Sequence, residues 1–194
     1  MSEPAKRKAI YEDLYDIPEN MTGEIINGEL IVTPRPSRKH TLATSLLVSE
    51  LIPPYFHGRG GGPGGWVIIV EPEIRLGEHM MVPDLAGWRQ ERYPVDEPHN
   101  WISVPPDWVC EMLSPGTRRL DRMKKMPVYA KYEVPYLWLA DPEEMTLEVF
   151  RLKEGEWIVA GLHEEGIKVR AIPFLEIEID LSDLWRQILS RQSS

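Results

Sequence analysis

Apolar residues along the chain alternate in some stretches and follow helical spacing in others, which predicts short strands interrupted by a few helices. The pair Asn27-Gly28 stands between alternating apolar residues and indicates a β-hairpin of residues 24–26 and 30–33. Residues 40–52 carry apolar side chains at close to helical spacing and predict an amphipathic helix that ends at two prolines. The other expected elements are a short helix at 10–15, strands at 66–70, 73–76, 82–88, 108–113, 136–140, 147–152, 156–160, 168–172 and 176–179, a helical segment at 118–132 and a terminal helix at 183–189.

This order of elements predicts an α/β protein with a mixed β-sheet flanked by helices. We expect one domain over residues 1–194, with residues 1–9 as a disordered leader. Residues 66–70 read as a strand buried on both faces, which residues 73–76 extend or pair with. Pro127 must bend the segment at 118–132 or lie near its start, because proline lacks a backbone donor.

Two local sequence features are predicted to have structural roles and no binding or catalytic role. Residues 58–65 are rich in glycine, but no Lys-Ser or Lys-Thr follows and a strand comes next, so a phosphate-binding loop is excluded in favour of a turn or hairpin loop. Ser182 is expected to cap the terminal helix.

Composition and charge narrow the class of protein. The only cysteine, Cys110, lies in an apolar run, so no disulfide forms within the chain and a reducing cytoplasm fits. No apolar run approaches the roughly 18 residues of a membrane span, and the charged start does not resemble a signal peptide. The net charge of -9 argues against a protein that coats nucleic acid non-specifically.

Two carboxylates on predicted strands are candidate ligands for a divalent cation. Asp84 stands near the start of the strand at 82–88, and Glu111 lies inside the apolar strand at 108–113. If these strands are neighbours, both carboxylates can share Mg²⁺ or Mn²⁺, which prefer oxygen ligands. A glutamate between apolar neighbours needs a partner or a metal, whereas a turn or cap position explains Asp84 equally well.

The helical segment carries a candidate for handling the attacking water. Lys125 can orient or deprotonate a water molecule in phosphodiester hydrolysis, although a solvated lysine on a helix face is the simpler alternative. Lys124 competes for this role but faces another direction, whereas Tyr129 shares a helix face with Lys125. Ser114 lacks a Gly-x-Ser-x-Gly context and reads as a turn residue.

Further candidates lie in the first third of the chain and in two basic groups. Glu24 is either an extra carboxylate ligand or a surface acid on its strand, and His40 either contacts phosphate or belongs to the helix start or the surface. The basic groups are Arg35, Arg38 and Lys39, and Arg118, Arg119, Arg122, Lys124 and Lys125. They allow a locally basic face on an acidic protein. We assign His40, Lys124 and Arg118 to substrate binding.

Six short motifs follow one another over roughly residues 10–180. They are Glu24-Ile-Ile-Asn-Gly-Glu-Leu30, Pro34-Arg-Pro-Ser-Arg-Lys-His40, Val82-Pro-Asp-Leu85, Val109-Cys-Glu-Met-Leu-Ser-Pro-Gly-Thr117, Asp121-x-x-x-Lys-Met-Pro-Val-Tyr129 and Val134-Pro-Tyr-Leu-Trp-Leu-Ala-Asp-Pro142. In this order they resemble the Uma-type putative restriction endonucleases, long catalogued as a domain of unknown function within the PD-(D/E)XK nuclease superfamily.

The resemblance implies a restriction-endonuclease-like core and a Mg²⁺- or Mn²⁺-dependent endonuclease. Asp84 and Glu111 match the metal-binding acids of the family, and Glu24 matches an early glutamate that supplies an extra ligand. The superfamily lysine normally lies two residues after the second acid, where this chain has Leu113, and in this family Lys125 takes its place. The usual Gly-Val-Pro-Glu-Tyr-Trp is replaced at residues 133–138 by Glu-Val-Pro-Tyr-Leu-Trp, which loses a glycine and an acid.

We therefore expect a cytoplasmic homodimer that cleaves nucleic acid, specifically DNA, without a membrane partner. Two alternatives stay open. One is a nuclease-fold protein that binds nucleic acid without cleaving it, which the acidic charge and the lack of an evident DNA-reading module favour. The other is an interaction protein with a dimer face formed by Trp66, Trp88, Trp101 and Trp138, although core packing is the default role of tryptophan.

Overall fold

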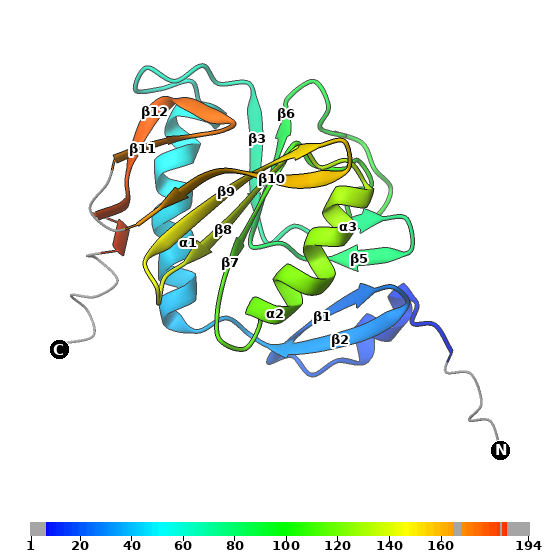
Figure 1. Cartoon of the computed structure of the whole chain (residues 1–194). Coiled ribbons are helices and arrows are strands. Elements are labelled where there is room, and N and C mark those ends of the chain that lie inside the picture. The colour runs from blue at the N-terminus through cyan, green and yellow to red at the C-terminus, as the bar shows by residue number, and fades with distance from the viewer. Residues whose placement is uncertain (1–6, 165–167, 183, 186–194) are drawn as a thin grey trace.

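The computed structural model describes residues 7–164, 168–182, 184 and 185. A six-stranded mixed sheet forms the centre, with strand order β10-β9-β8-β7-β6-β3 and one parallel pair, β7 and β8. Its strands are β3 (Trp66–Val70), β6 (Leu85–Arg89), β7 (Trp108–Met112), β8 (Tyr136–Asp141), β9 (Thr146–Lys153) and β10 (Glu156–His163). Figure 1 shows helix α1 on one side of this sheet and α2 and α3 on the other. The expected α/β class and mixed sheet flanked by helices are confirmed.

Smaller elements complete the fold. They are a 3₁₀ helix at Tyr11–Asp16, a four-stranded sheet of order β2-β1-β5-β4, made by β1 (Met21–Ile26), β2 (Glu29–Pro34), β4 (Ile74–Leu76) and β5 (His79–Met81), and a two-stranded sheet of β11 (Lys168–Ala171) and β12 (Phe174–Asp180). Helix α1 (Arg38–Leu51) runs into a π-helical turn at Ile52–Phe56. Among the described residues, no helix is long and apolar enough to cross a lipid bilayer.

Alternating residues of the central strands form two separate cores, one on each face of the sheet. The core on the α1 side includes Cys110 and Trp138, and the core on the α3 side includes Val109 and Leu137. This alternation follows from the two-residue repeat of a β-strand. A strand with both faces covered reads as a continuous apolar run, and β7 does so except at Glu111.

The hairpin predicted at Asn27-Gly28 is present and longer than expected. Both residues have positive φ, at 54° and 74°, as a two-residue hairpin turn requires. The helix predicted at residues 40–52 begins two residues earlier, because Ser37 caps it by accepting a hydrogen bond from the His40 backbone N–H.

Three strand predictions need correction. The strand β3 lies at the sheet edge, with Val70 48% exposed, so it is not buried on both faces. Residues 74–76 pair with β5 in the other sheet and not with β3. The strand expected from residue 82 begins only at Leu85, because Pro83 lacks a donor and the chain turns there, which leaves Asp84 just before the strand.

At both ends of the chain, the structure of the described residues differs from the prediction. Of the predicted leader, residues 1–6 lie outside the described part, but the Ala9 N–H donates to the Gly28 carbonyl at 2.8 Å and Arg7 pairs with Asp13. The terminal helix at 183–189 falls outside the described residues except for 184 and 185. Ser182 is itself helical and does not precede the helix as a cap.

The tryptophans do not form a dimer face. Trp66, Trp88 and Trp138 are at most 2% exposed and pack in the two cores, and Trp101 is partly buried. The prediction of a tryptophan-rich interaction face is therefore wrong, because these large side chains fill the space between the sheet and its covering elements.

Candidate functional site

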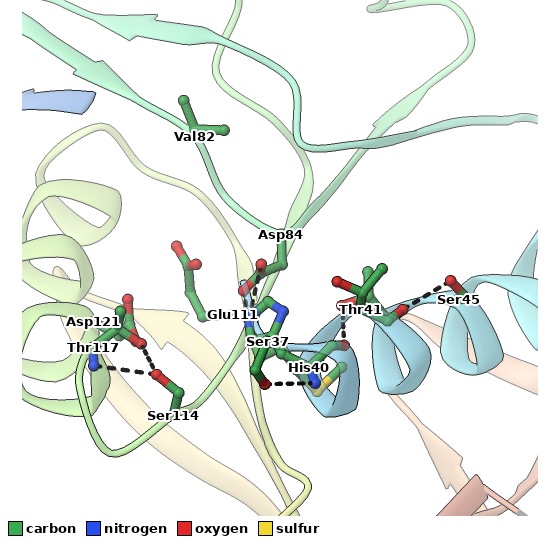
Figure 2. Close-up of polar contacts among 12 residues, drawn as sticks. Ser37, His40, Thr41, Ser45, Val82, Asp84, Glu111, Ser114, Thr117 and Asp121 are labelled. Atoms are coloured by element: carbon green, nitrogen blue, oxygen red, sulfur yellow. Dashed lines mark hydrogen bonds and ion pairs between the residues drawn. The ribbon is translucent and has the colours of Figure 1, made fainter. Parts of the chain in front are cut away.

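One cavity of about 380 Å³ holds most of the chemically active residues predicted from the sequence. It lies among the hairpin β1–β2, the start of α1, the approach to β6, the end of β7 and the segment that follows β7. Figure 2 shows the carboxylates of Asp84, Glu111 and Asp121 grouped between the start of α1 and the helical segment after β7. The acids reach this place from separate parts of the chain.

Glu111 forms the floor of the cavity and is 1% exposed. Its Oε1 atom accepts a hydrogen bond from the Tyr129 hydroxyl at 2.5 Å, and its Oε2 atom lies 3.1 Å from Lys125 Nζ. Burial raises the pKa of Glu111 well above its usual value, and Lys125 opposes this rise. The buried glutamate therefore has partners for both oxygens, as its position inside an apolar strand requires.

Lys125 joins three buried acids. Its ammonium lies 3.1 Å from Glu24 Oε1, 3.1 Å from Glu111 Oε2 and 3.7 Å from Asp121 Oδ1. Burial by itself lowers the pKa of Lys125, but Glu111, Glu24 and Asp121 outweigh it and raise the pKa well above the usual value. The side chain is therefore a charged hydrogen-bond donor in this arrangement.

The helical segment after β7 is irregular in a way that aims its side chains inward. It consists of α2 (Arg118–Leu120), a π-helical turn at Asp121–Lys125, here called η3, and α3 (Met126–Lys131). Pro127 lies in the first turn of α3, where its missing N–H costs little. Such π-turns occur frequently at functional sites, and this one leaves Asp121, Lys125 and Tyr129 all buried.

Two contacts fix the side chain of Asp84, which lies just before the start of β6. Its Oδ2 atom accepts from the Met112 backbone N–H at 2.6 Å, and its Oδ1 atom lies 3.1 Å from His40 Nε2. Because Leu85 pairs with Cys110 in the antiparallel ladder, the same register places Asp84 opposite Glu111. Burial lowers the pKa of His40, but the hydrogen bond and charge of Asp84 outweigh it and raise the pKa.

Comparison with known proteins identifies the family. The model of Uma2, described as a putative restriction endonuclease, matches residues 10–182. The chain belongs to the Uma2 family. No protein of curated function matches it.

A solved structure is similar over nearly the whole Uma2 domain. It is the 1.96 Å crystal structure of a putative nuclease belonging to DUF820 from Anabaena variabilis ATCC 29413, with a TM-score of 0.74 and 27% sequence identity. The match covers 91% of this chain and 97% of that one. Family and fold together indicate a restriction-endonuclease-like nuclease.

The Uma2 site fits a divalent cation in the chemistry of its donors. Glu24, Asp84, Glu111 and Asp121 all line the cavity, and carboxylate oxygens are the ligands that Mg²⁺ and Mn²⁺ prefer. The described residues nevertheless include no group of three or more acids, histidines or cysteines already arranged around a cation position. Lys125 instead lies between the acids, so a cation must share their oxygens with it or displace it.

Two residues assigned to substrate binding lie outside this cavity. Lys124 Nζ pairs with Glu29 at 2.6 Å, and Arg118 pairs with Asp141 at 2.6 Å. Neither lines the cavity. The third, His40, does line it, but its contact is with Asp84.

Several charged residues of the cavity were not assigned a role from the sequence, among them Asp121, Arg35 and Lys39. Asp121 stands four positions before Lys125, and this spacing on a helix could have placed it on the same face. Burial raises the pKa of Asp121 to about 6. Arg35 lines the cavity from the connection into α1 and Lys39 from the first turn of α1, and no pattern in the sequence distinguished them from Arg38, which does not line it.

Proposed function

We propose that the protein is a Mg²⁺- or Mn²⁺-dependent endonuclease that hydrolyses phosphodiester bonds of DNA, with Asp84, Glu111 and Lys125 as its central residues. The observation that carries the proposal is the Lys125 ammonium 3.1 Å from Glu111, in the cavity that Asp84 also lines. This reaction requires two acids and a lysine. The two acids come from the segment just before β6 and from β7, and the lysine comes from the helical segment after β7. The family and the fold support the same reaction class.

Asp84 and Glu111 would hold the cation, and Glu24 would supply a further oxygen. A bound Mg²⁺ or Mn²⁺ supplies charge stabilisation on the scissile phosphate and lowers the pKa of a coordinated water. Lys125 donates hydrogen bonds, orients the attacking water and offsets the charge that develops on the phosphate. The neighbouring carboxylates raise its pKa, which supports the role of a charged hydrogen-bond donor.

His40 and Tyr129 keep the two acids in position. His40 holds one oxygen of Asp84 while the Met112 N–H holds the other. Tyr129 holds Glu111 from α3. Carboxylates fixed in this way lose little conformational freedom when they bind a cation, which favours both affinity and correct geometry.

A cleavage assay with single substitutions tests the proposal. Purified protein is incubated with plasmid and with labelled oligonucleotides in the presence of Mg²⁺, Mn²⁺ or EDTA. We expect cleavage that needs the metal and falls by at least about 100-fold in Asp84→Asn and in Glu111→Gln, since metal-site groups contribute factors of this order. Glu78→Gln is the matched control, because Glu78 pairs with Lys8 at the surface and lies outside the cavity.

One observation favours a second candidate function, a nuclease-fold protein that binds nucleic acid without cleaving it. Lys125 already compensates the buried acids without any cation. This candidate predicts no cleavage with any divalent metal but measurable binding of DNA by fluorescence anisotropy. Cleavage that survives in Asp84→Asn and Glu111→Gln would instead contradict the assignment of the site.

The location and assembly expected from the sequence also remain proposals. A buried, unpaired Cys110 is compatible with a reducing cytoplasm. The homodimer gains no support from the tryptophans, because three of the four predicted face residues are buried in the cores. Sedimentation velocity over a range of concentrations tests it directly.

A further inference from the structure

We propose that Asp121 is a positioning residue for Lys125, which keeps the ammonium at the cavity when the other acids turn to a divalent cation. This inference deepens the proposed function and rests on it, since it concerns the same site with the cation bound. Three observations carry it: the acceptors that already surround Lys125, the elements that supply them, and the charge balance of the cavity.

Lys125 has the hydrogen-bond acceptors that it needs without Asp121. An ammonium carries three N–H donors, and three acceptors surround this one: Glu24 Oε1 and Glu111 Oε2 at 3.1 Å each, and the Val82 carbonyl at 3.4 Å. Asp121 Oδ1 lies 3.7 Å from the ammonium, beyond hydrogen-bond distance. In this arrangement Asp121 is therefore a further acceptor that the ammonium does not require.

The burial of Asp121 works against its charge. The residue is 3% exposed and lines the cavity. Burial raises the pKa of Asp121 to about 6, and the charge of Lys125 opposes this rise. Acids held in such surroundings are typical of functional sites. The cost of burying this carboxylate therefore indicates that it serves the site in another arrangement.

Asp121 and Lys125 belong to the same element, whereas the other acids around the ammonium come from elsewhere. Both residues lie on the π-helical turn η3, four positions apart. Glu24 reaches the ammonium from β1 and Glu111 from β7. Figure 2 shows Asp121 apart from Asp84, with Glu111 between them. The backbone of η3 therefore keeps Asp121 near Lys125, however the carboxylates on the strands turn.

Glu24 and Glu111 cannot serve an ammonium and a divalent cation equally well. Their oxygens are the ligands that Mg²⁺ and Mn²⁺ prefer, so a cation competes with Lys125 for them. A buried ammonium that loses its acids is strongly destabilised. Asp121 then supplies the opposite charge from within η3. Lys125 thus exchanges its strand partners for Asp121 and stays charged at the cavity, where it can orient the attacking water.

Cleavage kinetics at saturating Mn²⁺ test the proposal. For Asp121→Asn we expect kcat to fall at least about 10-fold while KM for DNA changes less than about 3-fold, because Lys125 loses its position and the surface that binds DNA is unchanged. Adding more Mn²⁺ should not restore kcat, as it would if only metal affinity were lost. A kcat equal to that of the wild type would overturn the inference.

Asp107→Asn is the matched control for these kinetics. Asp107 is also a buried acid with a basic partner, Arg92. It directly precedes β7, at the opposite end of the strand from Glu111, and it does not line the cavity. An equal fall of kcat in Asp107→Asn would overturn the inference, because loss of any buried acid would then have the same effect.

Calorimetric titration with Mn²⁺ separates positioning from metal ligation and needs no cleavage. Wild type, Asp121→Asn, Lys125→Met and the double variant form a double-mutant cycle. Asp121→Asn alone should weaken Mn²⁺ binding at least about 10-fold, because the displaced ammonium lacks a partner. In the Lys125→Met background the same substitution should change binding less than about 3-fold. Equal losses in both backgrounds would show that Asp121 binds the cation itself, and would overturn the inference.

The two experiments distinguish a failure of this inference from a failure of the proposed function. If the wild type cleaves no DNA with Mg²⁺ or Mn²⁺, the proposed function is overturned, and the inference stands or falls with the Mn²⁺ titrations. If Lys125→Met does not fold, the kinetics of Asp121→Asn decide the inference.

Discussion

The ammonium of Lys125 lies 3.1 Å from Oε2 of Glu111, and both side chains are at most 5% exposed. The contact joins the π-helical turn after β7 to the centre of β7 itself. Glu24 on β1 contacts the same ammonium. The positive charge of Lys125 therefore links the β1–β2 hairpin, the central sheet and the helical segment after β7. Removing it should therefore affect stability as well as chemistry.

Lys125→Met is expected to lower the free energy of unfolding by about 3 kcal/mol, because it leaves buried carboxylates without their cation. The neighbouring variant Lys124→Met removes an exposed pair with Glu29 and should cost less than about 1 kcal/mol. Urea denaturation in EDTA, followed by tryptophan fluorescence, measures both. Equal stability of the two variants would show that Lys125 does not compensate the acids.

Tyr129→Phe is expected to reduce activity by about 10-fold or more, because Glu111 loses the hydroxyl that holds Oε1. The matched control is Tyr55→Phe, which removes a hydroxyl that contacts Glu176 Oε2 at 3.0 Å outside the cavity. Tyr129→Phe should lose about 1 to 3 kcal/mol of stability through an unsatisfied buried carboxylate, whereas Tyr55→Phe should lose less, because Glu176 is exposed and water can replace the hydroxyl. Only Tyr129→Phe should also weaken Mn²⁺ binding by isothermal titration calorimetry, and a similar loss in Tyr55→Phe would argue for a general structural effect.

The central fold could be predicted because its signals are local. The Asn27-Gly28 turn requires positive φ, and the apolar run around Cys110 requires burial on both faces, so each pattern has few solutions. Pairing partners were harder to predict. Residues 74–76 and 79–81 form a separate small sheet with β1, and nothing in a three-residue strand specifies which neighbour it joins.

The candidate site could be predicted only where a residue conflicted with its surroundings. Glu111 stood out as an acid in an apolar strand, and the structure gives it partners at both oxygens. Arg118 and Lys124 carried no such conflict, and both pair with acids that are distant in sequence. Ion pairs of this kind depend on the tertiary arrangement, so a basic cluster in sequence did not indicate a basic face in space.

Asp121→Asn is expected to stabilise the protein at pH 8 by roughly 1 to 3 kcal/mol. Burial raises the pKa of Asp121 to about 6 in the folded protein. A carboxyl group with a raised pKa favours the folded state while it is protonated, and this contribution is lost as the pH rises through about 6. The advantage of the variant should therefore shrink toward pH 5. Urea denaturation at both pH values measures it, and a variant less stable than the wild type at pH 8 would mean that the contact with Lys125 outweighs the cost of burial.

His79→Asn should make the protein less sensitive to mild acid. His79 is fully buried, and its Nδ1 accepts a hydrogen bond from the Asn27 backbone N–H at 3.1 Å, so the ring is neutral. Burial lowers the pKa of His79 below its usual value. The unfolded chain therefore binds this proton more readily, and the wild type loses stability as the pH falls through about 6.5.

The amide oxygen of asparagine can accept the same hydrogen bond but takes up no proton, so the variant should lose about 1 kcal/mol less than the wild type between pH 7.5 and pH 5.5. His57→Asn, which replaces an exposed histidine at the end of the π-turn after α1, controls for the loss of one histidine. Urea denaturation at the two pH values provides the comparison. The same acid-induced loss in wild type and His79→Asn would show that another group controls the response.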